Sequence, residues 1–277
     1  MINGPDEVWV ERSGRLERTR VRFEGSDDLL GYIHRWISWS GGRIDASCPI
    51  ADGRMPDGAR VHAVLPPLAP TGPMVSIRRW PAERPDLVVL AKWGMLDVAS
   101  KDLLIAAVDE GFSIVISGGT GSGKTTLLNA LIAHVNPDER IVTVEETPEL
   151  VPSHPHVVSL LTRSQNVEGK GEVESAELLK AALRMRPDRI VVGEVRGREA
   201  FHALAAMSTG HEGSMMTVHA RSAGEVPDRL VTLALQERTA ASEDSLRRSV
   251  IAAFDLYVHL ERRGERRLVV SIESDRE

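Results

Sequence analysis

The fold is decided by the stretch Gly118-Gly119-Thr120-Gly121-Ser122-Gly123-Lys124-Thr125-Thr126. It fits the pattern G-x-x-x-x-G-K-[ST], in which backbone N–H groups surround phosphate, the lysine reaches the β- and γ-phosphates and the next hydroxyl holds Mg²⁺. The apolar segment 112–117 predicts a buried strand before it, and residues 127–132 predict a helix opening whose N-terminus favours anions. We therefore expect ATP and Mg²⁺ as cofactors, with phosphate contacts from Gly119, Thr120, Gly121, Ser122, Gly123, Lys124, Thr125 and Thr126.

The composition is that of an ordinary globular chain, long enough at 277 residues for two domains. A net charge of −6 and an aromatic content of 4% argue against a chain that mainly grips nucleic acid, so no direct nucleic-acid partner is expected. Cys48 is the only cysteine, which excludes an internal disulfide and fits a reducing cytoplasm. Because the N-terminus lacks signal-peptide features and the apolar run 103–116 is interrupted by Asp109 and Glu110, we expect a cytoplasmic protein that reaches a membrane only through partners.

The first 80 residues predict a small α+β domain. Strands are expected at 8–10 and 16–23 around a turn at Ser13-Gly14, and again at 60–65 and 74–78. A helix capped by Asp27 or Asp28 should run to Trp39. The proline-bracketed, charged residues 81–86 predict a linker that separates domain 1–80 from domain 87–277.

After this linker, apolar strands alternate with helices. Residues 141–144 and 189–192 predict buried strands, and 175–184 predicts a helix between them. Such alternation is typical of an α/β domain with a parallel sheet covered by helices on both faces. The functional site is then expected at the carboxyl ends of the strands.

Acidic residues follow both of these strands. Glu145 and Glu146 come after the first and Glu194 after the second. A carboxylate at this edge can bind Mg²⁺ directly or through water and can orient and deprotonate an attacking water. A solvent-exposed charge in a turn is the alternative for each, and it is stronger for the adjacent pair because one of the two could simply face solvent.

Arginines and histidines complete the candidates. Arg163 lies in the second domain, and Arg78 and Arg79 lie just before the linker, where a hinge could bring them to a nucleotide. A planar, permanently charged guanidinium suits the negative charge of phosphoryl transfer, although most arginines lie at a surface. His219 follows a short apolar run and could distinguish triphosphate from diphosphate, with a satisfied core histidine as the alternative. Its spacing of eight from His211 does not match a helical zinc pair.

These motifs together resemble the secretion ATPase superfamily of type II and type IV secretion and type IV pilus motors, and most of all the CpaF-type ATPases of Tad (Flp) pilus assembly. The similarity extends over nearly the whole chain. The segments that carry it are the phosphate loop 118–126, the acidic box 144–150, the segment 166–173, the atypical Walker B segment 186–197, the histidine box 217–220, and Leu65 to Leu68 with Ser76 to Arg79 in the first domain.

The resemblance implies a fold and a set of residue roles. The fold would be a RecA-like P-loop NTPase domain with a smaller N-terminal α+β domain, assembled as a homohexamer on an inner-membrane pilus or secretion platform. Lys124 would bind phosphate, Thr125 and Glu194 would hold Mg²⁺, and Glu145 would activate water. His219 would sense the γ-phosphate. The arginines Arg78, Arg79 and Arg163 would stabilise charge.

Two features depart from that family. Glu146 stands where relatives often have aspartate, and the chain begins where relatives usually have a further helical region, so it is either a shortened homologue or a fragment. The expected activity is ATP hydrolysis that powers pilus assembly or protein secretion. The alternatives are a DNA-translocating conjugation-type ATPase, a small-molecule kinase and a nucleotide-gated scaffold. DNA-stimulated turnover would favour the first of these, and a phosphorylated acceptor the second.

Overall fold

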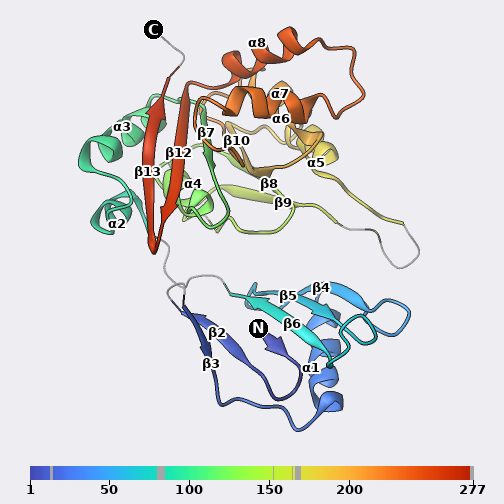
Figure 1. Ribbon diagram of the computed structural model, residues 1–277. Helices are drawn as coiled ribbons and strands as arrows, with labels where there is room; N and C mark the ends of the chain where they lie inside the picture. Colours follow the sequence, from blue (N-terminus) through green and yellow to red (C-terminus); the bar gives the residue numbers. More distant parts are fainter. Residues whose placement is uncertain (13–14, 80–84, 152, 164, 166–169, 275–277) are drawn as a thin grey trace. The chain divides into compact units, whose positions relative to one another are not determined.

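A computed structural model describes residues 1–12, 15–79, 85–151, 153–163, 165 and 170–274. The chain divides into two compact units, and each is described by itself (Figure 1). Of the described residues, 1–12, 15–79 and Lys170 belong to the smaller unit, and 85–151, 153–163, 165 and 171–274 belong to the larger one. The predicted linker 81–86 lies mostly outside the described residues. At its end, the Asp86 side chain accepts a hydrogen bond from the N–H of Val89 and so caps helix α2.

The larger unit contains a seven-stranded sheet in the order β13-β12-β7-β11-β10-β8-β9 (Figure 1). All neighbours are parallel except β13, which forms an antiparallel hairpin with β12. The strands are β7 (Ile114–Gly118), β8 (Ile141–Glu145), β9 (Val157–Leu161), β10 (Arg189–Val195), β11 (Met215–Val218), β12 (Leu256–Arg263) and β13 (Arg266–Glu273). The predicted parallel sheet is confirmed, with one antiparallel strand added at its edge.

Helices cover both faces of this sheet. They are α2 (Leu87–Lys92), α3 (Val98–Asp109), α4 (Lys124–Ile132), α5 (Ser175–Ala182), α6 (Glu199–Met207), α7 (Val226–Ala234) and α8 (Glu243–Ala253). Strand β7 shows how the layers are built, because successive side chains of a strand point to opposite faces. Val115 packs with α5 to α8, and Ile114 and Ile116 pack with α2 to α4.

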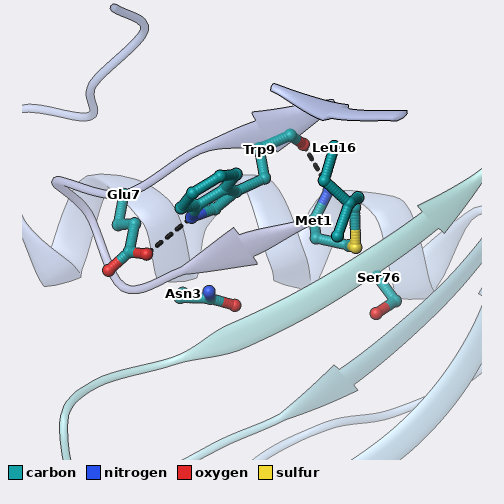
Figure 2. Close-up of a pocket in the computed structure, with 6 residues that line it drawn as sticks. All are labelled: Met1, Asn3, Glu7, Trp9, Leu16 and Ser76. Carbon is teal, nitrogen blue, oxygen red and sulfur yellow. Dashed lines mark hydrogen bonds between the residues drawn. The ribbon is translucent and has the colours of Figure 1, made fainter. Parts of the chain in front are cut away.

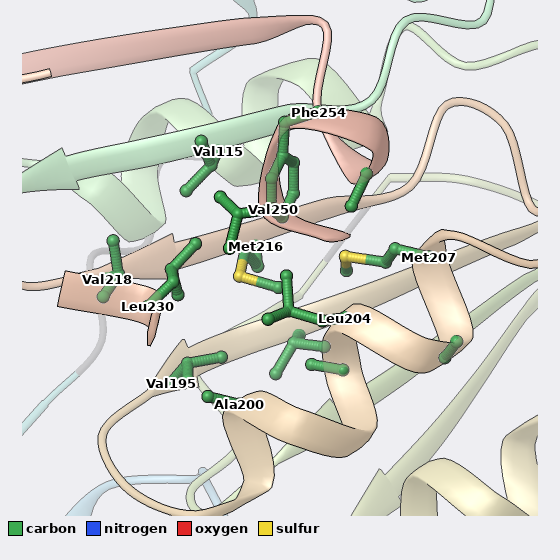
Figure 3. Packing of buried hydrophobic residues seen from close by; sticks show 14 of the residues in the cluster. Val115, Val195, Ala200, Leu204, Met207, Met216, Val218, Leu230, Val250 and Phe254 are labelled. Carbon is green, nitrogen blue, oxygen red and sulfur yellow. The ribbon is translucent and has the colours of Figure 1, made fainter. Parts of the chain in front are cut away.

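The core on the first of these faces is shown in Figure 3. Leu204 of α6, Leu230 of α7 and Val250 of α8 meet Val115 and Met216 of the sheet. Each of these side chains is buried. Because both faces are covered by apolar residues, the central strands are almost continuously hydrophobic, as parallel strands usually are.

The smaller unit is an α+β structure. An antiparallel sheet in the order β1-β6-β5-β4 packs against helix α1, and β2 pairs with β3 in a separate hairpin. The predicted helix is present as α1, and its apolar side chains Leu29, Ile33 and Ile37 are fully buried in this core. The elements are β1 (Ile2–Asn3), β2 (Trp9–Arg12), β3 (Arg15–Arg18), α1 (Ser26–Ser38), β4 (Ile50–Arg54), β5 (Arg60–Val64) and β6 (Met74–Arg78).

Two predictions for this unit were wrong. The strand expected over 16–23 ends at Arg18, and the turn expected at 13–14 lies outside the described residues. No side chain caps α1, whose N-cap is Gly25. Asp27 and Asp28 lie within the first turn, and Asp28 accepts from the N–H of Glu24. Carboxylates there still complement the helix dipole.

A shallow hollow of about 370 Å³ opens on this unit between β1, β2, β3 and β6 (Figure 2). Trp9 lines it, and its indole N–H donates to Glu7 at 2.5 Å. Elsewhere, no helix among the described residues combines the length and apolar character that a membrane crossing requires.

Candidate functional site

The phosphate loop joins β7 to α4, as the sequence predicts. Its backbone has positive φ angles at Gly118, Gly121 and Gly123. At Gly118 the requirement for glycine is steric as well, because a Cβ atom would lie 2.3 Å from the carbonyl oxygen of Leu260 on β12. The backbone conformation of the loop therefore requires glycine at these positions. The loop leads directly into the N-terminus of α4, which favours anions.

Lys124 is the first residue of α4, and its side chain lies within the loop. Its Nζ donates to the carbonyl oxygens of Gly118 at 3.0 Å and Gly119 at 3.1 Å, and it lies 3.9 Å from Oε1 of Glu194. Burial lowers the pKa of Lys124, while the charge of Glu194 opposes that shift. A buried ammonium at the mouth of a glycine loop fits a polyphosphate anion, so the residues present fit ATP.

Glu194 and His219 meet beside this ammonium. Glu194 lies near the end of β10 and His219 follows β11, and the two strands are parallel neighbours. The Nε2 atom of His219 lies 2.6 Å from Oε1 of Glu194. Burial and then the charge of Lys124 lower the pKa of His219, and Glu194 raises it. The structure thus brings together three of the residues that the sequence predicts.

Arg196 joins the same cluster, although no sequence pattern distinguishes it from the neighbouring arginines. Its guanidinium donates to Glu194 through Nε at 2.7 Å and reaches Glu146 through Nη1 at 3.3 Å. Burial works against the charged form of Arg196, but its bond to Glu194 and the nearby carboxylates raise its pKa. Arg196 therefore holds Glu194 through Oε2, whereas His219 contacts the other carboxylate oxygen, Oε1.

Thr125 contacts an acid that the sequence did not single out. Its hydroxyl donates to Oε2 of Glu149 at 3.1 Å. Asn129, one turn along α4, donates to the backbone carbonyls of both Thr125 and Glu149. A hydroxyl beside a carboxylate next to the phosphate loop suits Mg²⁺ and its water ligands. The signal for Glu149 was the acidic box itself, in which this third glutamate follows Glu145 by four residues.

Glu145 has a different position from Glu149. It is buried at the end of β8, and its Oε1 accepts the N–H groups of Glu149 and Leu150, each at 2.8 Å. Gly193 passes close beside it, since a Cβ atom there would lie 2.9 Å from Cγ of Glu145. In this structure Glu145 fixes the segment that carries Glu149. Its expected role in activating water stays a prediction.

The three remaining arginine candidates lie elsewhere. Arg163 follows β9, and its guanidinium donates to the carbonyl of Gly171. Arg78 ends β6 in the smaller unit, and Arg79 follows it. Their roles in charge stabilisation stay predictions.

Comparison with known proteins decides the family. The model of the family "Type II/IV secretion system protein" matches residues 1–263. This chain belongs to the type II/IV secretion system ATPase family. A putative conjugal transfer protein of Mycobacterium tuberculosis is 43% identical over 276 residues, covering 97% of this chain and 78% of the relative. The conjugal transfer protein TrbB of Rhizobium radiobacter is 39% identical over 276 residues, covering 97% and 80%.

A solved structure extends the comparison to the fold. The VirB11 ATPase of the Brucella suis type IV secretion system, in complex with sulphate, shares 28% identity with a TM-score of 0.57, covering 99% of this secretion ATPase and 91% of that chain. The predicted fold class, an α/β RecA-like ATPase domain with a smaller α+β domain, is confirmed. The family to which the chain belongs is one of ATPases. That loop 118–126 holds the nucleotide stays a prediction.

Proposed function

We propose that this chain is an ATP-hydrolysing motor that drives pilus assembly or protein secretion. One observation carries the proposal: Lys124, Glu194 and His219 converge at the mouth of the phosphate loop, with Glu194 Oε1 2.6 Å from His219 and 3.9 Å from Lys124. A cation, a carboxylate and an imidazole at one point provide phosphate binding, water orientation and proton acceptance.

The side chains divide these tasks. ATP supplies the phosphoanhydride bond that is hydrolysed. Lys124 neutralises phosphate charge. Thr125, with Glu149 beside its hydroxyl, would hold Mg²⁺ and its water ligands, and the expected contribution of Glu194 to Mg²⁺ binding stays a prediction. Glu194, held by Arg196 and His219, orients the attacking water and accepts its proton. Because His219 contacts the carboxylate directly, protonation of Glu194 changes the charge that His219 faces beside the phosphate loop.

The motor belongs to a Tad pilus assembly apparatus. The acidic, Walker B and histidine boxes and the Leu65 to Leu68 segment resemble those of CpaF-type ATPases, which supports Tad pilus assembly. The working unit is a homohexamer in the cytoplasm, docked on an inner-membrane platform protein. In it, hydrolysis drives rigid-body movement of one domain against the other. Arg78, Arg79 and Arg163 supply charge stabilisation.

A second candidate is a motor of a conjugation apparatus. The relatives at 43% and 39% identity are named as conjugal transfer proteins, which supports it. If the motor moves DNA directly, single-stranded or duplex DNA will stimulate phosphate release, and the stimulation will fall steeply with salt. If DNA has no effect, the chain acts on a protein apparatus.

The first experiment is phosphate release by purified protein carrying Lys124→Ala. We expect turnover to be abolished, because the variant loses the cation in the loop. Lys101→Ala is the matched control, since Lys101 lies on α3 and pairs with Asp102. Normal hydrolysis by the Lys124→Ala protein would refute the proposed function. Light scattering with and without a non-hydrolysable ATP analogue tests the hexamer.

A further inference from the structure

The β12–β13 hairpin brings two arginines against the outer flank of the phosphate loop. Arg267 donates through Nε to the carbonyl oxygen of Gly121 at 3.0 Å. Its side chain also covers Gly123, where a Cβ atom would lie 3.2 Å from Cδ of Arg267. A Cβ atom at Gly121 would lie 3.7 Å from Nη1 of Arg262. Both arginines therefore lie close to the loop itself.

The position of the hairpin beside the loop is fixed by sheet pairing and by a backbone hydrogen bond to the rest of the unit. Leu260 of β12 pairs with Gly118 in the sheet, and its carbonyl oxygen occupies the space where Gly118 would carry a Cβ. The N–H of Val269 on β13 donates to the carbonyl oxygen of Met95 at 2.7 Å. Strands β12 and β13 run beside β7 as one long hairpin in Figure 1.

The stability of the hairpin does not explain the arginine pair. Arg262 and Arg267 are direct cross-strand partners, so their side chains share one face. Like charges placed directly opposite each other destabilise a strand pair. Both residues are also exposed, which leaves their planar groups accessible to a ligand. The next pair, Arg263 and Arg266, has the same opposed charges, and what distinguishes Arg262 and Arg267 is their position against the phosphate loop.

The strand order indicates which part of a nucleotide lies there. Glu194 and His219 come from β10 and β11, on one side of β7, and the hairpin lies on the other side. Given the proposed function, on which this step rests, the terminal phosphate faces the Glu194 and His219 side. The nucleoside must then extend past the loop toward β12 and β13.

We propose that Arg262 and Arg267 bind the nucleoside part of the nucleotide, with a guanidinium stacked on the base. The planar, delocalised cation stacks on π systems, which a lysine ammonium does not do. The hairpin is then a second wall of the nucleotide site, although Arg267 and its partner Gly121 in the phosphate loop are 146 residues apart in the sequence.

The test compares two double variants by calorimetric titration with magnesium ADP and with magnesium pyrophosphate, which lacks the nucleoside. Arg262→Gln with Arg267→Gln removes the proposed contacts. Arg263→Gln with Arg266→Gln is the matched control, because these residues form the next cross-strand pair and point to the opposite face. Both variants lose the same charge from the same hairpin.

We expect the first variant to bind ADP about tenfold more weakly and the control to stay within about twofold of the unmodified protein. Pyrophosphate affinity should stay within about twofold for both, which also shows that each variant is folded. Unchanged ADP affinity in the first variant would overturn the inference, as would an equal loss for pyrophosphate, which would mean that the arginines only shape the loop. An unmodified protein that binds neither ligand would instead refute the proposed function, and this inference with it.

Discussion

The Nε2 atom of His219 lies 2.6 Å from Oε1 of Glu194, although the two residues end different strands. The contact exists because β10 and β11 are parallel neighbours, so their carboxyl ends meet at one edge of the sheet. A register shift between Val192 and Val195 falls at Glu194. The charge of Glu194 therefore favours the protonated form of His219 and opposes the burial that lowers the pKa of this imidazole.

Substitution of Glu194 should change the titration of His219. Burial and then Lys124 lower the pKa of His219, and Glu194 is the charge that raises it. In Glu194→Gln we expect this pKa to fall further below its ordinary value, measured from the imidazole chemical shifts of histidine-labelled protein. Glu146→Gln is the control, because Glu146 contacts Arg196 and not His219. A pKa that rises in Glu194→Gln would show that the carboxylate does not stabilise the imidazolium.

The same lowered pKa should appear in the stability of the protein. The unfolded chain binds a proton at His219 more readily than the folded one, since the folded pKa lies below 6.5. The stabilisation is therefore fully present above the unfolded pKa and is lost as the pH falls through the folded value. We expect His219→Gln to flatten the loss of unfolding free energy between roughly pH 7 and pH 5, measured by urea denaturation. An unchanged slope would refute this.

Glu149 should support Mg²⁺, and Glu146 should not. Glu149 accepts the hydroxyl of Thr125, whereas Glu146 is exposed and contacts Arg196. For Glu149→Gln we expect the Mg²⁺ concentration for half-maximal phosphate release to rise by roughly 10- to 100-fold, as for other residues that position a metal's ligands. For Glu146→Gln we expect a shift of less than about threefold. Equal shifts in the two variants would remove Glu149 from the site.

The different positions of Glu145, Glu146 and Glu149 show which parts of the site can be predicted from the sequence and which cannot. The strand, loop and helix around Lys124 follow from residues that are contiguous, so local patterns predict them well. The bonds by which Glu145 fixes the segment that carries Glu149 do not follow from such local patterns, because they depend on Glu145 lying beside Gly193 on a neighbouring strand. The hairpin beside Gly121 is equally invisible, since sheet pairing brings it there from the far end of the chain.

The buried ion pair of Arg189 and Glu139 should matter more than any surface pair. Arg189 is 4% exposed, bonds Glu139 through Nε at 2.5 Å, and also donates to the carbonyl oxygen of Val108. Because Glu139→Gln leaves a buried guanidinium uncompensated, we expect a loss of about 3 kcal/mol in unfolding free energy. Asp228→Asn, which breaks the exposed pair with Arg247, should cost less than about 1 kcal/mol. Similar losses of unfolding free energy in Glu139→Gln and Asp228→Asn would show that burial does not make the Arg189–Glu139 pair more important for stability.

Gly193→Ala should damage the site without touching a charged group. The added Cβ would lie 2.9 Å from Cγ of Glu145, whose Oε1 holds the N–H groups of Glu149 and Leu150. We expect a loss of roughly 1–3 kcal/mol by urea denaturation, together with slower phosphate release, because Glu149 moves away from its partner hydroxyl. Gly224→Ala is the control, since no heavy atom lies within 4 Å of its Cβ position. Full activity in Gly193→Ala would mean that Glu145 does not position Glu149 for turnover.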